Sequence, residues 1–229
     1  MGPRAKLSSE QRRAAIIQAV RRVFAEKGFH GTTTRALADA AGVSEALLFK
    51  HFPNKEALFS AMQLSCCTAQ DHDHFERLHA LEPSASTLVV MVHFMVSRVV
   101  GRCGSGEELA IQNRLMLRSF AEDGEFARLA LRGLTEFWIP KVGECLKAAV
   151  VAGDALAGPV RASSSGWFAH HLPVIIMTHL LPAKPVVDYG LSRDELVEQA
   201  VWFILRGMGL KEEAIRRYYN PKALTLLMG

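Results

Sequence analysis

The twenty residues from Thr34 to Pro53 have the spacing of a helix-turn-helix, and this feature constrains the fold of the 229-residue chain more than any other. Ala38 is small enough to let two helices cross closely, and Gly42 can adopt the positive φ of a sharp turn between helices. Val43 and Leu48 follow as apolar residues that pack the second helix onto the first. The spacing therefore predicts two short helices joined by a tight turn.

Capping residues and apolar periodicity predict a further helix on each side of this motif. Residues 12–27 place apolar side chains along one face, and Ser8 with Gln11 has capping-box spacing at the start of that helix. Thr33 is the expected N-cap of the helix that follows. Asn54 is the expected N-cap of a fourth helix after Pro53. We expect four helices within the first 60 or so residues.

The run from Ala25 to Phe59, AEKGFHGTTTRALADAAGVSEALLFKHFPNKEALF, resembles the N-terminal domain of the TetR-type (TetR/AcrR) one-component transcriptional repressors. The shared features are a glycine before a threonine pair, the turn Ala-x-x-Ala-Gly-Val-Ser, an aromatic residue near the centre of the second helix, and Phe-x-x-Lys-Glu-x-Leu. The resemblance implies a homodimer whose N-terminal domains bind a palindromic operator in double-stranded DNA. It also implies a larger helical domain that binds a small molecule and thereby weakens DNA binding.

Charge differs between the two domains that this resemblance implies, residues 1–62 and residues 63–229. The first contains ten Lys and Arg against five Asp and Glu, whereas the second contains seventeen against eighteen. A basic excess neutralises phosphates and steers association with DNA, although it carries no sequence information. An ordinary solvated basic surface is the alternative explanation of this charge.

In a helix-turn-helix, the second helix enters the major groove with its N-terminal residues facing base edges. Here that helix is expected over residues 44–52. The residues expected to reach bases are Glu45, Ala46, Leu47 and Lys50. Those expected at phosphates are Thr33, Thr34, Arg35, Ser44, His51 and Lys55. Phe49 is also expected among the DNA-binding residues. The structural alternative stays open for single residues, since Thr33 can simply cap its helix and Glu45 can simply favour the helix dipole.

Three positions depart from the family pattern. Phe49 stands where tyrosine is usual, so it offers no phenolic hydroxyl to a phosphate. His51 stands where another tyrosine is common, and its imidazole can still donate to a phosphate. Ala46 stands where glycine is frequent. These differences affect the contacts expected with DNA and leave the motif itself intact.

The rest of the chain is expected to be helical, because it contains no sustained strand periodicity and no Asn-Gly hairpin turn. The fold class is therefore all-α: a three-helix DNA-binding motif joined through a fourth helix to a larger helical domain. Helices are expected over residues 88–100, 107–120, 125–151, 163–181 and 192–210, with a kink at Pro140. The run over residues 88–100 is too short to span a membrane and predicts a buried helix.

The last two of these helices correspond to the pair that forms a four-helix bundle between subunits in the family. The expected dimer interface is an apolar stripe made of Leu196, Val197, Ala200, Val201, Phe203 and Ile204. A small, largely apolar effector is expected among the middle helices, against Met91, Phe94, Met95, Met116, Phe120, Phe137 and Trp138. Plain core packing is the alternative for both sets, and a satisfied core histidine is the alternative to an effector contact for His93.

Other classes of function have little support in the sequence. Neither a catalytic motif nor a phosphate-binding glycine loop is present, so an enzyme is not expected, and no cofactor is expected either. Residues 66–67 are Cys-Cys and residues 71–74 alternate Asp and His, but their spacing does not favour a metal site. A helical protein-interaction module would leave the basic N-terminal excess unexplained. Four unpatterned cysteines and the lack of an apolar leader segment predict a cytoplasmic protein.

Overall fold

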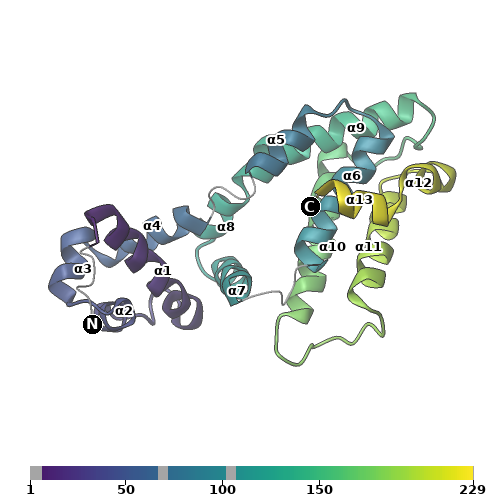
Figure 1. Ribbon diagram of the computed structural model, residues 1–229. Helices are drawn as coiled ribbons and strands as arrows, with labels where there is room; N and C mark the ends of the chain where they lie inside the picture. The colour runs from purple at the N-terminus through teal and green to yellow at the C-terminus, as the bar shows by residue number, and fades with distance from the viewer. Residues whose placement is uncertain (1–6, 67–71, 102–106, 229) are drawn as a thin grey trace. The chain divides into compact units, whose positions relative to one another are not determined.

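The computed structural model describes residues 7–66, 72–101 and 107–228, and it divides into two compact units (Figure 1). Unit 1 comprises residues 1–69 and 108–131, and unit 2 comprises residues 70–107 and 132–229. The described residues form helices, together with one isolated β-bridge between Ala155 and Leu210. None of the helices in these described ranges has the length and apolar character needed to cross a bilayer. The expected all-α fold class is confirmed.

The first three helices of unit 1 have the N-terminal caps that the sequence predicts. Helix α1 (Ser9–Lys27) begins at a capping box in which Ser8 and Gln11 each accept from the other's backbone N–H. Helix α2 (Thr34–Ala41) begins at Thr33, whose side chain accepts from the N–H of Ala36. Helix α3 (Glu45–His51) follows after Gly42, which has a φ of 63° as the tight turn requires. Local chemistry therefore sets the boundaries of the motif.

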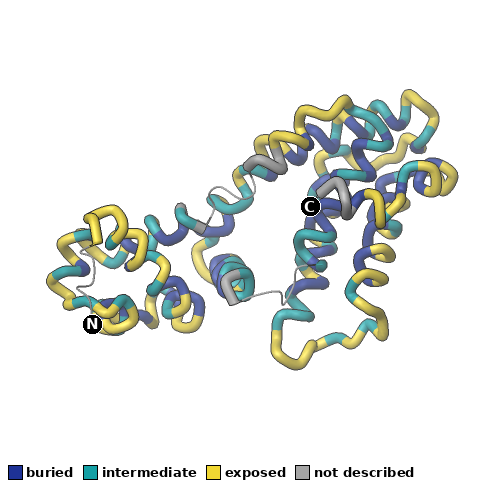
Figure 2. The backbone as a smooth tube through the Cα atoms, viewed as in Figure 1, coloured by how far each residue is buried: buried dark blue, intermediate teal, exposed yellow. Residues whose placement is uncertain are grey.

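Helix α4 (Lys55–Cys66) completes the predicted N-terminal helices, and Asn54 caps it through a 2.7 Å hydrogen bond from the N–H of Ala57. The four helices enclose an apolar core in which Phe24, Leu37 and Leu58 are almost fully buried. Figure 2 shows buried stretches of the backbone alternating with exposed ones along the N-terminal helices. The ring of Phe24 meets that of Phe59 edge to face at 4.9 Å. Aromatic pairs of this geometry stabilise a core beyond the area that they bury.

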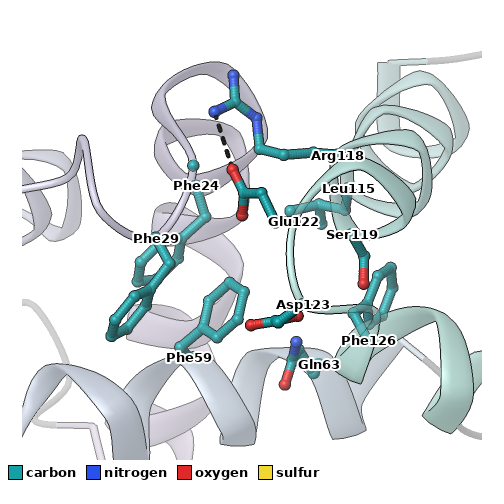
Figure 3. Close-up of a pocket in the computed structure, with 11 residues that line it drawn as sticks. Phe24, Phe29, Phe59, Gln63, Leu115, Arg118, Ser119, Glu122, Asp123 and Phe126 are labelled. Carbon is teal, nitrogen blue, oxygen red and sulfur yellow. Dashed lines mark ion pairs between the residues drawn. The ribbon is translucent and has the colours of Figure 1, made fainter.

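Two helices from the middle of the sequence also belong to unit 1. Helices α7 (Glu107–Ala121) and α8 (Glu125–Ala130) contribute Ile111, Leu115 and Phe126 to the same core as Phe24. Figure 3 shows where these two helices meet the N-terminal helices of unit 1. Arg118 of α7 forms an ion pair with Glu122 there, beside the phenylalanine rings. Arg118 also donates to the carbonyl of Glu26 near the end of α1. Unit 1 is therefore built from two separate stretches of the sequence. The sequence analysis expected a single division of the chain between residues 62 and 63.

Unit 2 contains the remaining helices. In chain order they are α5 (His72–Ala80), α6 (Ala85–Val96), the π-helical segment η1 (Ser97–Gly101), the π-helical segment η2 (Leu134–Trp138), α9 (Ile139–Val151), α10 (Ala162–Leu180), α11 (Arg193–Gly207), α12 (Glu212–Tyr218) and α13 (Pro221–Met228). Helix α6 is the most buried of them, as its apolar sequence predicts, and helices α9, α10 and α11 pack against it. The core of unit 2 is therefore built around α6.

The helix expected over residues 125–151 is broken, and the kink expected at Pro140 stays a prediction. Pro140 lies in the first turn of α9, directly after the π-helical segment η2. The break lies earlier, between the end of α8 at Ala130 and the start of η2 at Leu134. Pro173, which the sequence analysis did not single out, lies inside α10 instead. Proline alone did not locate the break because its effect depends on its position within the helix.

The apolar stripe of α11 is mostly core in this chain. Of the six residues expected at a dimer interface, five are buried inside unit 2, namely Leu196, Val197, Ala200, Val201 and Ile204. Only Phe203 is exposed, at 70%. The five buried residues face α6 and its neighbours because α11 packs on that central helix. The structure therefore corrects the expected interface at these five positions, where core packing was the alternative.

The C-terminal helices are fastened to unit 2 by polar contacts as well as apolar ones. Tyr218 donates to Asp154 at 3.2 Å, and Arg217 lies 3.7 Å from the same carboxylate. The hydroxyl of Tyr219 lies 3.4 Å from Nδ1 of His93 in α6, and Nε2 of His93 lies 3.3 Å from the hydroxyl of Ser97. Burial lowers the pKa of His93 and raises the pKa of Tyr219, so both stay neutral. His93 is a satisfied core histidine.

Candidate nucleic-acid interface

Helix α3 has one solvent-exposed face and one face that packs on the core of unit 1. Ser44 caps the helix by accepting from the N–H of Leu47, so α3 begins directly after the tight turn that follows α2. Leu48 is 2% exposed and fastens the helix to the core. The exposed residues of this stretch are Ser44, Glu45, Ala46, Phe49 and Lys50, whereas Leu47 and His51 are half-buried. The residues expected to contact DNA therefore lie mainly on the accessible side of the helix.

Two of the expected contact residues bind each other. The hydroxyl of Thr34, at the start of α2, donates to Oε2 of Glu45 in the first turn of α3 at 2.7 Å. This bond links the N-termini of the two helices of the motif. Glu45 keeps further acceptor capacity, since a carboxylate has two oxygens. The carboxylate is thus oriented before any ligand arrives.

An arginine that the sequence analysis did not select supports the other end of α3. Arg13 of α1 donates to the backbone carbonyl of His51 at 2.6 Å, and its guanidinium lies 4.2 Å from the ring centroid of Phe52. The last carbonyls of a helix have no N–H partner within the helix, and a cation near them also interacts favourably with the helix dipole. Arg13 lies 38 residues from its partner in sequence, so no local pattern could reveal the contact.

Lys55 is placed differently from the expectation of a phosphate contact. Its ammonium donates to the carbonyls of Phe29 at 2.9 Å and Thr32 at 3.1 Å, and it lies 4.2 Å from the ring centroid of Phe29. Two of its three donors are therefore engaged inside unit 1. Lys55 holds the loop between α1 and α2, and its expected contact with a phosphate stays a prediction that rests on the third donor. Thr33 and Arg35 are exposed at the start of α2.

The seven residues expected at an effector pocket are distributed over both units. Met116 packs on the core of unit 1 and Phe120 is 51% exposed there, whereas the other five belong to unit 2. Phe94 and Met95 are buried in α6 as core residues. Met91, Phe137 and Trp138 line a common hollow, together with Leu78, His79 and Lys141. The effector pocket therefore stays a prediction, and these three of its members share a hollow within unit 2.

Metal-ligating side chains do not gather within the described ranges: no group of three or more His, Cys, Asp or Glu residues there could hold an ion. Of the cysteine and aspartate-histidine runs considered above, Cys67 and Asp71 lie outside the described residues. Cys145 is a free, fully buried thiol, and burial raises its pKa.

Residues 16–62 match the model of the bacterial regulatory proteins of the tetR family. The nucleoid occlusion factor SlmA of Marinomonas sp. (strain MWYL1) is 31% identical over 124 residues, which are 53% of this chain and 57% of SlmA. The HTH-type transcriptional regulator UidR of Escherichia coli (strain K12) is 30% identical over 84 residues, which are 35% of this chain and 43% of UidR. The matched region thus spans little more than half of the length of SlmA, and less than half of UidR.

Solved structures extend the likeness in fold to most of the chain. A regulatory protein in the tetR family from Rhodococcus RHA1 aligns with a TM-score of 0.62 at 18% identity, covering 88% of this chain and 99% of that one. FadR from Bacillus subtilis in complex with stearoyl-CoA aligns with a TM-score of 0.58 at 18% identity, covering 85% and 98%. AibR in complex with isovaleryl coenzyme A and operator DNA also aligns with a TM-score of 0.58, at 19% identity, covering 84% and 97%. Residues 16–62 therefore match the tetR family of bacterial regulatory proteins, and the fold of most of the chain is similar to that of solved regulators of this family.

Proposed function

We propose that this protein is a sequence-specific DNA-binding transcriptional regulator, acting as a homodimeric repressor that an effector releases from a palindromic operator. The observation that carries the proposal is the exposed face of α3, held on a buried core at Leu48 and fixed at both ends by the Thr34–Glu45 and Arg13–His51 contacts. A rigid, exposed helix of this kind fits the major groove. Relatives described as transcriptional regulators, such as UidR, support the same function.

Within the proposed interface, Lys50 and Glu45 read base edges. Lys50 is exposed and donates to guanine, while Glu45 accepts from a cytosine amino group. Ala46 and Leu47 meet thymine methyl groups, and Phe49 adds apolar contact beside the phosphates. Thr33, Arg35, Ser44 and His51 bind phosphates, which position the helix without selecting sequence. Thr34 exchanges between Glu45 and the backbone of the DNA.

The homodimer is proposed to form through the outer face of α10 and α11, which pack together in unit 2. Phe168 and Ile175 of α10 are 62% and 51% exposed, and their spacing of seven residues places them on one side of the helix. Phe203 of α11 is 70% exposed. Large apolar side chains left in water on neighbouring helices favour association with a second copy. Two α3 helices would then lie in successive major grooves, roughly 34 Å apart.

Selection of bound duplexes from a random DNA pool tests this function, with Lys50→Ala compared with the wild-type protein. We expect a palindrome whose half-sites are about one helical turn apart. In Lys50→Ala, preference at one base pair of each half-site is expected to weaken by about 1–3 kcal/mol. Lys147→Ala, which changes an exposed lysine of α9, is the control and should select the wild-type sequence. Absence of any enriched sequence at low salt would contradict the proposed function.

Arg13→Ala separates positioning of α3 from phosphate binding. We expect operator affinity to fall about fivefold, because an exposed charge-assisted contact contributes on the order of 1 kcal/mol. The dependence of affinity on salt should stay the same, since Arg13 donates to the carbonyl of His51 rather than to DNA. Fluorescence anisotropy at several salt concentrations measures both quantities. A salt slope reduced by about one would instead make Arg13 a phosphate contact.

A further inference from the structure

A small hollow in unit 2 combines an apolar floor with one buried cation. It is lined by Leu78 and His79 of α5, Met91 of α6, Phe137 and Trp138 of η2, and Lys141 of α9. Trp138 and Met91 are each 1% exposed and form part of the floor. The cavity volume is about 10 Å³, which is room for a single water molecule. Lys141 is the one lysine or arginine among these lining residues.

Lys141 is buried, and the ion pair that it forms is a long one. Its side chain is 7% exposed, and the carboxylate that the structure places near it is Glu144, with Nζ and Oε2 3.9 Å apart. That separation is too long for a hydrogen bond, and the side chain of Glu144 is 58% exposed. Removing an ammonium from water costs several kcal/mol unless a partner compensates. A lysine in this setting favours an anion that enters the hollow.

The rim of the hollow is an aromatic contact between two exposed residues. His79 of α5 and Phe137 of η2 meet edge to face, with ring centroids 6.1 Å apart, and Phe137 is 44% exposed. Phe137 and Trp138 are consecutive residues of the π-helical segment η2, and Phe137 is exposed whereas Trp138 is buried. Such turns occur frequently at functional sites. Rotation of the Phe137 side chain away from His79 would widen the hollow over Trp138 and Lys141.

We propose that this hollow is the anion-binding end of the effector site, and that its ligand is a small amphipathic carboxylate. The carboxylate accepts hydrogen bonds from the ammonium of Lys141, while the apolar body of the ligand packs against Met91 and Trp138 and displaces Phe137. The inference rests on the proposed function, because it names the class of ligand that the effector domain binds. It also adds a charge requirement to an effector otherwise expected to be largely apolar.

Calorimetric titration of the full-length protein tests the proposal with 4-phenylbutyrate and octanoate, each paired with its uncharged alcohol, 4-phenylbutan-1-ol or octan-1-ol. We expect saturable binding of at least one of the two carboxylates to the wild-type protein. In Lys141→Met, a neutral side chain of similar length, that affinity should fall on the order of tenfold to a hundredfold. Affinity for the alcohols should be unchanged. Lys147→Met removes an exposed lysine from the same helix and should behave as the wild type.

Each outcome distinguishes this inference from the function on which it rests. If neither carboxylate binds a protein that selects an operator, the inference is overturned and the proposed function stands. Equal losses of carboxylate and alcohol affinity in Lys141→Met would also overturn it, because Lys141 would then act only on structure. If carboxylates bind in the expected Lys141-dependent way but no DNA sequence is selected, the ligand site stands and the proposed function fails.

Discussion

Replacing Phe24 by alanine is expected to destabilise unit 1 by about 3–5 kcal/mol, as large-to-small changes of a buried aromatic residue do. Phe24 is fully buried, packs edge to face on Phe59 and shares a core with residues of α7 and α8. Its removal leaves a cavity that several helices would have to close at once. Denaturant unfolding followed by circular dichroism measures the loss, because helices of both units contribute to that signal.

The three tryptophans make this experiment specific to one unit. Trp138, Trp167 and Trp202 all belong to unit 2, so tryptophan emission follows unit 2 alone. We expect Phe24→Ala to lower the denaturant midpoint seen by circular dichroism more than the midpoint seen by emission. Phe120→Ala changes a half-exposed phenylalanine of the same unit and should stay within about 0.5 kcal/mol of the wild type. A Phe24→Ala protein as stable as the Phe120→Ala control would contradict the packing described for unit 1.

A substitution of Gly209 by alanine is expected to produce the largest backbone effect in unit 2. Gly209 has a φ of 93°, a conformation that costs other residues on the order of 1–3 kcal/mol. A Cβ at this position would also lie 2.8 Å from the carbonyl oxygen of Leu156, which is backbone and cannot rotate away. The carbonyl of Gly209 accepts from the N–H of Leu156 at 2.8 Å, beside the bridge between Ala155 and Leu210. We therefore expect this link to open.

Gly207→Ala is the matched control, two residues away in the same chain segment. A Cβ on Gly207 meets nothing within 4 Å, and Gly207 is the last residue of α11, so alanine is expected to be neutral or slightly stabilising. Tryptophan emission during urea unfolding measures both variants, since this region belongs to unit 2. Equal midpoints for the two variants would show that the backbone near Leu156 yields easily, contrary to the expectation.

The parts of the fold that the sequence predicted well are those decided by neighbouring residues. Ser8, Thr33, Ser44 and Asn54 cap their helices as expected, because a capping side chain meets an N–H only two or three residues ahead. Gly42 takes the left-handed conformation for an equally local reason. The position of α3, and therefore the list of residues on its exposed face, follows from these few sites.

The parts that the sequence did not predict depend on partners far away along the chain. Lys55 could be placed near the DNA by analogy, but its contacts with Phe29 and Thr32 appear only once α4 packs beside that loop. The stripe on α11 is as apolar as an interface would be, and only the position of α6 shows that most of it is core. Apolar periodicity states which face of a helix is buried but does not state what covers it.

The discontinuity of unit 1 has a consequence for how such a protein can be divided. The chain leaves unit 1 after residue 69, returns at residue 108 and leaves again after residue 131. A fragment that ends at Met62 would keep the whole helix-turn-helix yet lose Ile111, Leu115 and Phe126, which complete its core. The helix-turn-helix is therefore not a unit that can be transferred to another protein by itself. Any hybrid regulator that borrows it must also take α7 and α8, and with them the two chain connections that bracket residues 108–131.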